Sequence, residues 1–453
     1  MSEHADRPNR HRLDEEVQAL SRPQPPSPLT ALRHGFALGV HRAVRTPELW
    51  RDVVTGRALR SPSSWLRGRA VQAVADHLAT GGPSAAEVAR QILAAPDLYP
   101  SDLVASLRAR RIRIPPMDPR RVREALAELS DVVSIEPEPR QIWPLLQVHG
   151  GSVDGLPVTV VVRRGGVEVA TQADAALAAL LLDPLSRTMP LIGALHPLGF
   201  VQLTARVALE QVDLRYEADA ARRLNEVLRE SGFQDVHVLE PDPVIFTPTA
   251  LVRPQFPHVP LGAPARPELA DPQGSLRALA LLTVEAALRK GFFWADPAVE
   301  RLAVDRAGRL VVTSVGAMGE LSRPLRKAGI AFLRAFLSGD HAGQVEAMSQ
   351  AGALSDRTDR SLLVSELARA EELAPTRLVF GGESALLAGL NTAIRLLLRH
   401  EVRPPLSVVL LMRALFALAE VARRIDPSGS GLAIAILPIL QNFDQIAEEL
   451  DAQ

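Results

Sequence analysis

The spacing of apolar residues changes along the chain, and this change constrains the fold more than any other feature. From Leu29 to about Leu129 apolar residues recur every three or four positions, which is typical of amphipathic helices. Short apolar or β-branched runs follow at residues 145–149 and 158–163, on either side of the turn signal Asp154-Gly155. Helical spacing returns from about residue 170. The pattern predicts a helix-rich α+β fold, in which an antiparallel sheet follows an all-helical region.

The middle of the chain mixes the two kinds of spacing. A long helix is predicted over residues 204–230, and short strands are predicted near Val236, Val244 and Leu251. The Pro-rich residues 254–272 are typical of a linker.

Helical spacing dominates the last third of the chain. Ser275 is a plausible N-cap for a helix that ends at Lys290-Gly291. Residues 302–305 and 310–313 predict a hairpin, since a polar, Gly-containing segment joins them. Helices are expected from there to the end.

Composition excludes several classes of function. The 453 residues are 47% apolar and 23% charged, with 51 Lys and Arg against 52 Asp and Glu, so a disordered or strongly basic protein is excluded. The chain has no Cys, which excludes disulfides, thiolate metal sites and a Cys nucleophile. Its 11 His are scattered, and the sequence lacks a phosphate loop, an H-E-x-x-H zinc motif and a G-x-S-x-G elbow.

The sequence indicates a cytoplasmic protein. Residues 1–28 are polar and Pro-rich without the apolar core of a signal peptide, and we expect a disordered tail there. The apolar run at residues 407–421 is too short to cross a bilayer and carries Arg413 and Glu420. We therefore expect no transmembrane segment, and membrane contact only at the periphery.

One segment is locally basic. Its arginines are Arg108, Arg110, Arg111, Arg113, Arg120, Arg121 and Arg123. Aromatic residues that would stack on bases are absent between them, so we expect no nucleic-acid binding. A solvated helix face is the first interpretation, and contact with anionic lipid headgroups or with an acidic partner surface is the alternative.

Several motifs resemble the UbiB/AarF family of atypical protein-kinase-like proteins. Residues 291–297 read GFFWADP and are followed by the predicted hairpin and then by Ser314-Val315-Gly316. The family pattern is GFFHADPHPGN, a hairpin, then DFG. Residues 147–149 with 158–167 resemble its IGQVH and VAVKVQRPGV segments, and residues 213–218 resemble its ELDYRREA helix. The resemblance covers about 370 residues, from near Gly82 to the end.

This resemblance implies a two-lobed, protein-kinase-like α+β fold with an α-helical N-terminal extension. The expected parts are a tail at residues 1–28, the extension at 29–128, a small lobe with an antiparallel sheet at 129–262, and a helical large lobe at 263–453.

The resemblance also implies that phosphoryl-transfer residues have been replaced. Asp296 matches the catalytic-loop Asp, whereas Arg301 and Ser314 stand at its two magnesium-ligand positions, those of the loop Asn and the DFG Asp. Val161 stands at the nucleotide Lys, which leaves its helix partner Glu217 without that cation. In the extension, the KxGQ motif reads Glu87 to Arg90, which reverses the charge of its Lys.

These departures favour a pseudokinase, not an enzyme, that acts as a binding, scaffolding or regulatory module with an unknown protein partner. By analogy we place it near quinone or isoprenoid-lipid metabolism, with no cofactor or metal expected and Asp296 vestigial. One alternative is a divergent ATPase or kinase that uses ATP and magnesium through Asp296, with Glu217 and Asp305 as substitute carboxylates. The other is a lipid-binding protein that meets isoprenoid lipid or a membrane through the arginine run.

Overall fold

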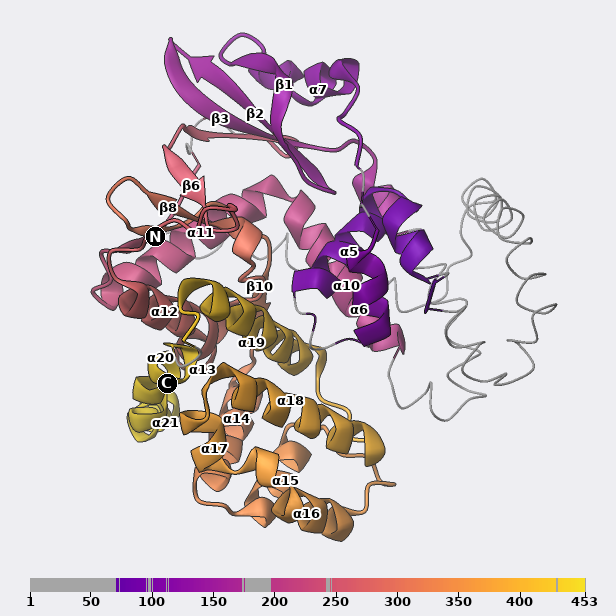
Figure 1. Ribbon diagram of the computed structural model, residues 1–453, viewed down its shortest axis with the longest axis vertical. Coiled ribbons are helices and arrows are strands. Elements are labelled where there is room, and N and C mark those ends of the chain that lie inside the picture. The colour runs from indigo at the N-terminus through magenta and orange to yellow at the C-terminus, as the bar shows by residue number, and fades with distance from the viewer. Residues whose placement is uncertain are drawn as a thin grey trace, which may run out of the picture. The chain divides into compact units, whose positions relative to one another are not determined.

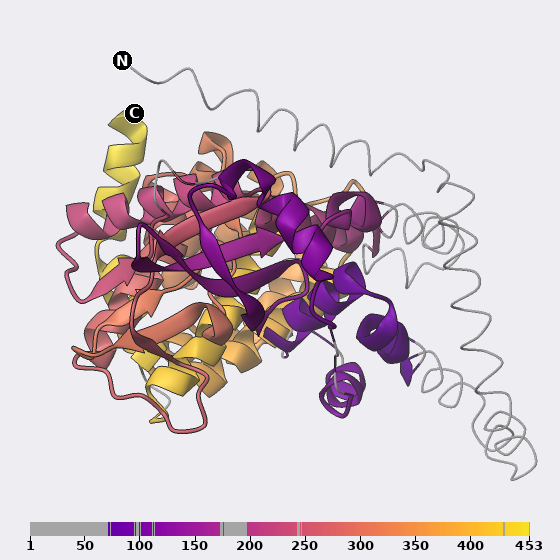
Figure 2. The same ribbon diagram turned by 90° about the horizontal axis from the view of Figure 1, so that it is seen from above.

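The computed structural model describes most of the chain beyond residue 70 (Figures 1 and 2). The described residues are 71–452, apart from 73, 95, 97–98, 100, 111, 113, 173–174, 176–196, 242–244, 246 and 429–430. The predicted tail, the first part of the helical extension, Arg111, Arg113 and the strand near Val244 lie outside them. Two compact units divide the chain: Met1–Gly155, Thr159–Gly193 and Pro197–Val212 form the first, and Leu156–Val158, Ala194–His196 and Asp213–Gln453 form the second.

The described part of the first unit opens with helices, as the apolar spacing predicts. They are α5 (Pro83–Ala94), α6 (Ser101–Arg108) and α7 (Pro119–Ala125), with α10 (Pro197–Val212) later in the chain. The apolar faces of α5 and α6 bury Ala89, Ile92, Val104 and Leu107 in one core cluster. Burial of this stripe is what holds such short helices together, because isolated helices of this length are marginal in water.

An antiparallel sheet completes the first unit. Its strands β1 (Ser134–Ile142), β2 (Leu146–Val153) and β3 (Leu156–Arg163) run in that order. The turn between β2 and β3 takes positive φ at both Asp154 and Gly155, which confirms the predicted turn. Strand β1 was not predicted from the sequence. Its SIEPEPRQI sequence contains two prolines and lies largely exposed at the sheet edge, where Pro is tolerated.

The second unit opens with α11 (Leu214–Glu230), β4 (Val236–Val238), β5 (Ala250–Pro254) and β6 (His258–Pro260). The prediction of one helix over residues 204–230 was wrong. Asp213 leaves the helical conformation and its side chain caps α11 by accepting from Arg215 N, so α10 and α11 are separate helices. The predicted linker also contains a strand, since β6 pairs with the hairpin described next.

A mixed four-stranded sheet in the order β4-β9-β8-β6 forms around the predicted hairpin. Strands β8 (Leu302–Asp305) and β9 (Leu310–Val312) confirm that hairpin, and β4 runs parallel to β9. Two further strands, β7 (Phe292–Trp294) and β10 (Met318–Glu320), pair antiparallel on either side of it in the sequence. They were not predicted from the sequence.

Helices make up the remainder. The predicted helix at residue 275 comprises α12 (Pro272–Ala280), a π-helical turn at Leu281–Glu285, and α13 (Ala286–Arg289). Ser275 is not its N-cap. Asp271 caps the helix by accepting from Gly274 N, and Ser275 is buried in the first turn.

The last eight helices confirm the predicted helical C-terminal region. They are α14 (Arg323–Leu337), α15 (His341–Gln350), α16 (Arg360–Arg369), α17 (Pro375–Phe380), α18 (Gly382–Arg399), α19 (Leu406–Ile425), α20 (Gly431–Gln441) and α21 (Phe443–Ala452). Within the described part of the chain, no helix combines the length and apolarity required to cross a membrane.

Candidate functional site

The candidate site is the buried carboxylate of Asp296, which lies in the second unit. Asp296 follows β7, and its backbone oxygen accepts from Ala298 N as the chain turns into the 3-10 turn Val299–Arg301. The residue is 0% exposed. A carboxylate so deeply buried must be compensated by cations or hydrogen bonds to stay ionised.

Two arginines compensate Asp296, one at each oxygen. Arg301 Nε and Nη2 both lie 2.8 Å from Oδ2. Arg413, which projects from α19, donates through Nη2 to Oδ1 at 2.8 Å. Both arginines are at most 3% exposed. The carboxylate therefore bridges two buried guanidinium groups.

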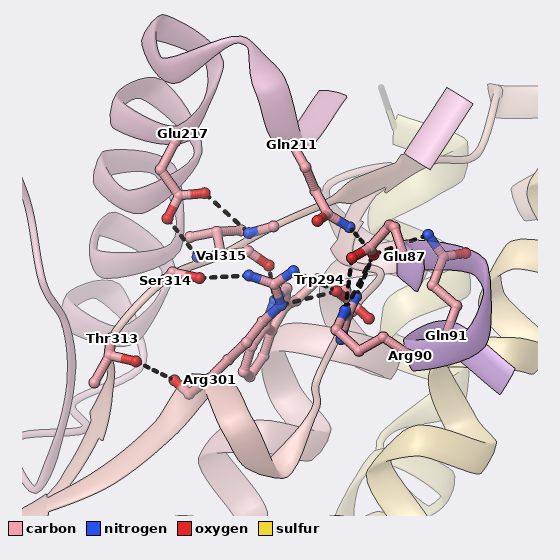
Figure 3. Close-up of polar contacts among 12 residues, drawn as sticks. Glu87, Arg90, Gln91, Gln211, Glu217, Trp294, Arg301, Thr313, Ser314 and Val315 are labelled. Atoms are coloured by element: carbon pink, nitrogen blue, oxygen red, sulfur yellow. Dashed lines mark hydrogen bonds and ion pairs between the residues drawn. The ribbon is translucent and has the colours of Figure 1, made fainter. Parts of the chain in front are cut away.

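Arg301 also contacts Ser314, the other residue at an expected metal-ligand position. Its Nη1 donates to Ser314 Oγ, while its backbone oxygen accepts from Thr313 N at 2.8 Å and Thr313 Oγ1 at 3.0 Å (Figure 3). Gly316 has a φ of +76°, and a Cβ there would come within 2.3 Å of the Arg301 Cζ. Glycine is thus required at 316 both for its conformation and for the approach of the guanidinium.

The Glu217 carboxylate binds the backbone of Val315 and Gly316, which follow Ser314. It lies in the first turn of α11 and its carboxylate accepts from Val315 N at 2.6 Å and Gly316 N at 2.9 Å (Figure 3). Hydrogen bonds from backbone amides to a carboxylate are among the stronger ones in proteins. The Glu217 carboxylate is therefore paired with two backbone N–H groups.

Arg253 on β5 supplies a cation that the sequence did not reveal. Its Nη1 donates to the backbone oxygen of Thr313, and the residue is 8% exposed. Burial lowers the pKa of the Arg253 guanidinium, and the negative charge of Glu217 opposes that shift. Arg253 and Glu217 thus hold residues 313–316 from two different elements and neutralise each other in part.

The arrangement does not fit a magnesium ion. Magnesium requires oxygen ligands in near-octahedral geometry. Both oxygens of Asp296 face guanidinium groups, and Ser314 Oγ is neutral and accepts from Arg301. Among the described residues there is also no group of three or more His, Cys, Asp or Glu placed to hold a metal.

The altered residues of the first unit form their own contacts. Val161 lies in β3 and is 4% exposed, so an apolar side chain suits the position. Glu87 on α5 is 1% exposed and accepts from Arg90 Nε and Nη2, from Gln91 Nε2, and from Gln211 Nε2 on α10 (Figure 3). Glu87 and Arg90 therefore form an ion pair within α5, and the hydrogen bond from Gln211 joins Glu87 to α10.

The described arginines of the basic segment fall into two groups, one with internal hydrogen bonds and one exposed to solvent. Arg110 donates to Asp76, Gln72 and the Ser106 backbone oxygen, so it is part of an internal network. The other described members are exposed: Arg108, Arg120, Arg121 and Arg123. The exposed members agree with a solvated face, and Arg110 does not.

Comparison with known proteins finds a kinase-like domain and a relative that resembles part of this chain. Residues 134–348 match the family model described as the ABC1 atypical kinase-like domain. The Pseudomonas putida protein described as "Probable protein kinase UbiB" is 27% identical over 248 residues, which are 52% of this chain. The matched part spans 45% of that relative, less than half of its length.

Two solved structures are more distant. The complex structure of Rv3197-erythromycin from Mycobacterium tuberculosis is 17% identical with a TM-score of 0.48, and the match covers 83% of this chain and 95% of that one. The crystal structure of Cex1p is 14% identical with a TM-score of 0.21, covering 71% and 61%. The helix-rich α+β, protein-kinase-like fold thus contains a region, residues 134–348, that matches the ABC1 atypical kinase-like domain, and the relative supports a likeness to UbiB-type proteins.

Proposed function

We propose that this protein is a pseudokinase, a family member that works as a binding, scaffolding or regulatory module through a protein partner. The observation that carries the proposal is the bridge from Arg301 through Asp296 to Arg413. A kinase needs a catalytic Asp with an oxygen that can accept the proton of the attacking hydroxyl. Here each oxygen of that Asp is paired with a guanidinium.

The neighbouring groups support the same proposal. Arg301 places a fixed positive charge where the family has a magnesium ligand, and a divalent cation beside it would be repelled. Glu217 is engaged with Val315 N and Gly316 N. Each change blocks a different requirement of phosphoryl transfer, and together they form one set of mutual contacts.

A divergent ATPase would need substitute carboxylates. Asp305 does not suit that role, because its oxygens are already engaged. Asp305 closes the β8–β9 hairpin, where it accepts from Ala307 N, Arg309 N and Arg309 Nε. Burial by itself raises the pKa of Asp305, but these hydrogen bonds together outweigh burial and hold that pKa below its ordinary value. We therefore favour the pseudokinase over this alternative.

Magnesium-dependent nucleotide binding is expected to be absent. In a thermal-shift titration, ATP or ADP with magnesium should leave the melting temperature of the full chain unchanged. A nucleotide present at 100 times its Kd would instead add about 2.7 kcal/mol to the free energy of unfolding. Calorimetry should give no magnesium-dependent heat of binding.

The matched comparison is a repaired variant, Arg301→Asn with Ser314→Asp, which restores both metal-ligand positions. Micromolar magnesium-ATP binding by the unmodified chain, or ATP turnover that Asp296→Asn abolishes, would overturn the pseudokinase proposal.

We further propose that the protein works at a membrane surface that carries anionic lipid headgroups. The family resemblance points to quinone or isoprenoid-lipid metabolism, and the exposed arginines on α7 suit anionic headgroups.

We expect the protein to float with anionic vesicles. The variant with Arg120, Arg121 and Arg123 changed to Gln should bind them about a hundredfold more weakly, because each arginine contributes about 1 kcal/mol. A control variant removes the same charge from the exposed arginines Arg222, Arg360 and Arg399. Equal flotation of both variants, or flotation without anionic lipid, would remove this role.

A further inference from the structure

Three hydrogen bonds in series link strands β1 and β2 of the first unit to the residues that precede α7. The backbone N–H of Met117 donates to Gln147 Oε1 at 2.7 Å. Gln147 and His149 both lie on β2, and their Nε2 atoms are 2.8 Å apart. His149 Nδ1 lies 2.9 Å from the backbone oxygen of Glu136 on β1. The side chains of Gln147 and His149 are buried, so these contacts form without competition from bulk solvent.

The two ends of this series determine where His149 carries its hydrogen. A backbone N–H can only donate, and a backbone carbonyl can only accept. Met117 N therefore requires the oxygen of the Gln147 amide, which turns the NH2 group of that amide toward His149 Nε2. The backbone oxygen of Glu136 requires a hydrogen on Nδ1. Only a neutral imidazole with its hydrogen on Nδ1 satisfies all three contacts.

Protonation of His149 is incompatible with this series. An imidazolium carries a hydrogen on both ring nitrogens, so its Nε2–H would face the NH2 group of Gln147. Rotation of the Gln147 amide removes that conflict, but it turns the NH2 group toward the N–H of Met117. In either orientation one buried donor lacks an acceptor, which is costly in free energy.

The neighbouring charges do not supply an acceptor for a charged His149. Among the described residues, its ring nitrogens bond only to the Gln147 side chain and the Glu136 backbone. The pKa of Glu136 lies below its ordinary value, chiefly because Arg140 donates to it and in smaller part because of charge at His149, while burial opposes both. The Glu136 carboxylate is exposed, so solvent screens its attraction for His149. The charged residues on the elements next to His149 are Glu136, Glu138 and Arg140 on β1, Arg163 and Arg164 at the end of β3, and Asp118 before α7.

We propose that His149 is a pH-sensitive switch for the segment of residues 114–118, which leads into α7. When His149 is neutral, Gln147 holds Met117 N against the sheet, and when His149 is charged, that hold is lost. Arg164 binds the same segment separately, because its Nη2 donates to the backbone oxygen of Pro115 at 2.9 Å. The release is therefore local to the residues that enter α7. The inference goes beyond the proposed function, since it depends on neither a nucleotide nor a lipid.

The test follows His149 and Met117 in the full chain as the pH is lowered from about 8 to about 5, the range in which histidine ordinarily changes charge. The chain has 11 His and 6 Met, so selective ¹⁵N labelling of each type makes both residues observable by NMR. At the upper pH we expect the hydrogen of His149 on Nδ1. As His149 takes up a proton, the protection of the Met117 amide against hydrogen exchange should fall at least about tenfold, because its acceptor is lost.

The variant Gln147→Glu should abolish this response. Both oxygens of the new carboxylate accept, so it can bind Met117 N and a charged His149 at the same time. Protection of the Met117 amide should then stay constant as His149 is protonated. Gln344→Glu is the matched control, since Gln344 also contacts a histidine, His341, at 3.4 Å. This control should retain the response of the unmodified chain.

Three results would overturn the proposal: a hydrogen on Nε2 of neutral His149, a His149 that stays neutral over the whole pH range, or an equal loss of Met117 protection in Gln147→Glu. If Gln147→Glu fails to fold, the unmodified chain decides. Its His149 signal and its Met117 protection should then change with the same midpoint in pH, and separate midpoints would contradict the switch.

Discussion

Asp296→Asn is expected to lower the free energy of unfolding by about 3–5 kcal/mol, because it leaves two buried guanidinium groups without their shared carboxylate. Asn is close to Asp in shape, so the change removes charge with little change in packing. The amide would also present an N–H group toward one of the arginines. Chemical denaturation of the full chain, followed by circular dichroism, measures the loss.

The sign of the change in unfolding free energy distinguishes a structural Asp296 from a catalytic one. Active-site residues are commonly kept at a cost to stability, so replacing a catalytic Asp often leaves a protein equally or more stable. A structural Asp between two arginines must behave in the opposite way. A stability equal to or above that of the unmodified chain would therefore contradict the bridge as described.

Two further variants sharpen the comparison. Asp444→Asn removes the carboxylate of an exposed pair with Arg334 and should change stability little, since surface pairs contribute little. The triple variant Asp296→Leu, Arg301→Met, Arg413→Met replaces the whole bridge by apolar groups and should recover much of the loss, because buried ion pairs are often no better than apolar packing. Recovery would show that the unpaired charge, and not the missing side chain, causes the instability.

Much of the second unit could be predicted from the sequence because its signals are local. The β8–β9 hairpin and the helix end at Gly291 are encoded by neighbouring residues, and both are present. Arg301 and Ser314 were singled out through the family resemblance, and the structure brings them together with Asp296. The resemblance implied the loss of metal ligands. It did not reveal that these side chains would bond to one another.

The remaining partners come from distant segments, and this is why they were missed. Arg413 is 117 residues from Asp296, and Arg253 is 60 from Thr313. A usable signal existed for Arg413, since a charge within the apolar run of residues 407–421 must find a partner if that face is buried. In the sequence-based prediction, that charge counted only against a membrane span. Arg253 gave no comparable signal, because it precedes a Pro-rich segment that was taken for a linker.

Glu217→Gln is expected to lower the free energy of unfolding by about 2–3 kcal/mol, because hydrogen bonds to a charged group contribute about 1.5–3 kcal/mol each. The Gln oxygen can still accept from one of Val315 N and Gly316 N, but the amide nitrogen would face the other N–H group. Arg253 would also lose the carboxylate that offsets its charge. Glu226→Gln, at an exposed position on the same helix, controls for the change in helix propensity and should have little effect.

A local measurement tests whether Glu217 acts through these two amides. Hydrogen exchange of residues 313–317 should accelerate in Glu217→Gln and stay unchanged in Glu226→Gln, since the Glu217 carboxylate is the acceptor for the amides of Val315 and Gly316.

Trp294 provides a second readout, because its Nε1 donates to the backbone oxygen of Val315 at 2.7 Å. Release of Val315 should alter the near-UV signal of Trp294, and that difference should vanish when Trp294→Phe is added to both proteins. Loss of stability without faster exchange at residues 313–317 would mean that Glu217 stabilises α11 itself, and would remove the proposed hold on this segment.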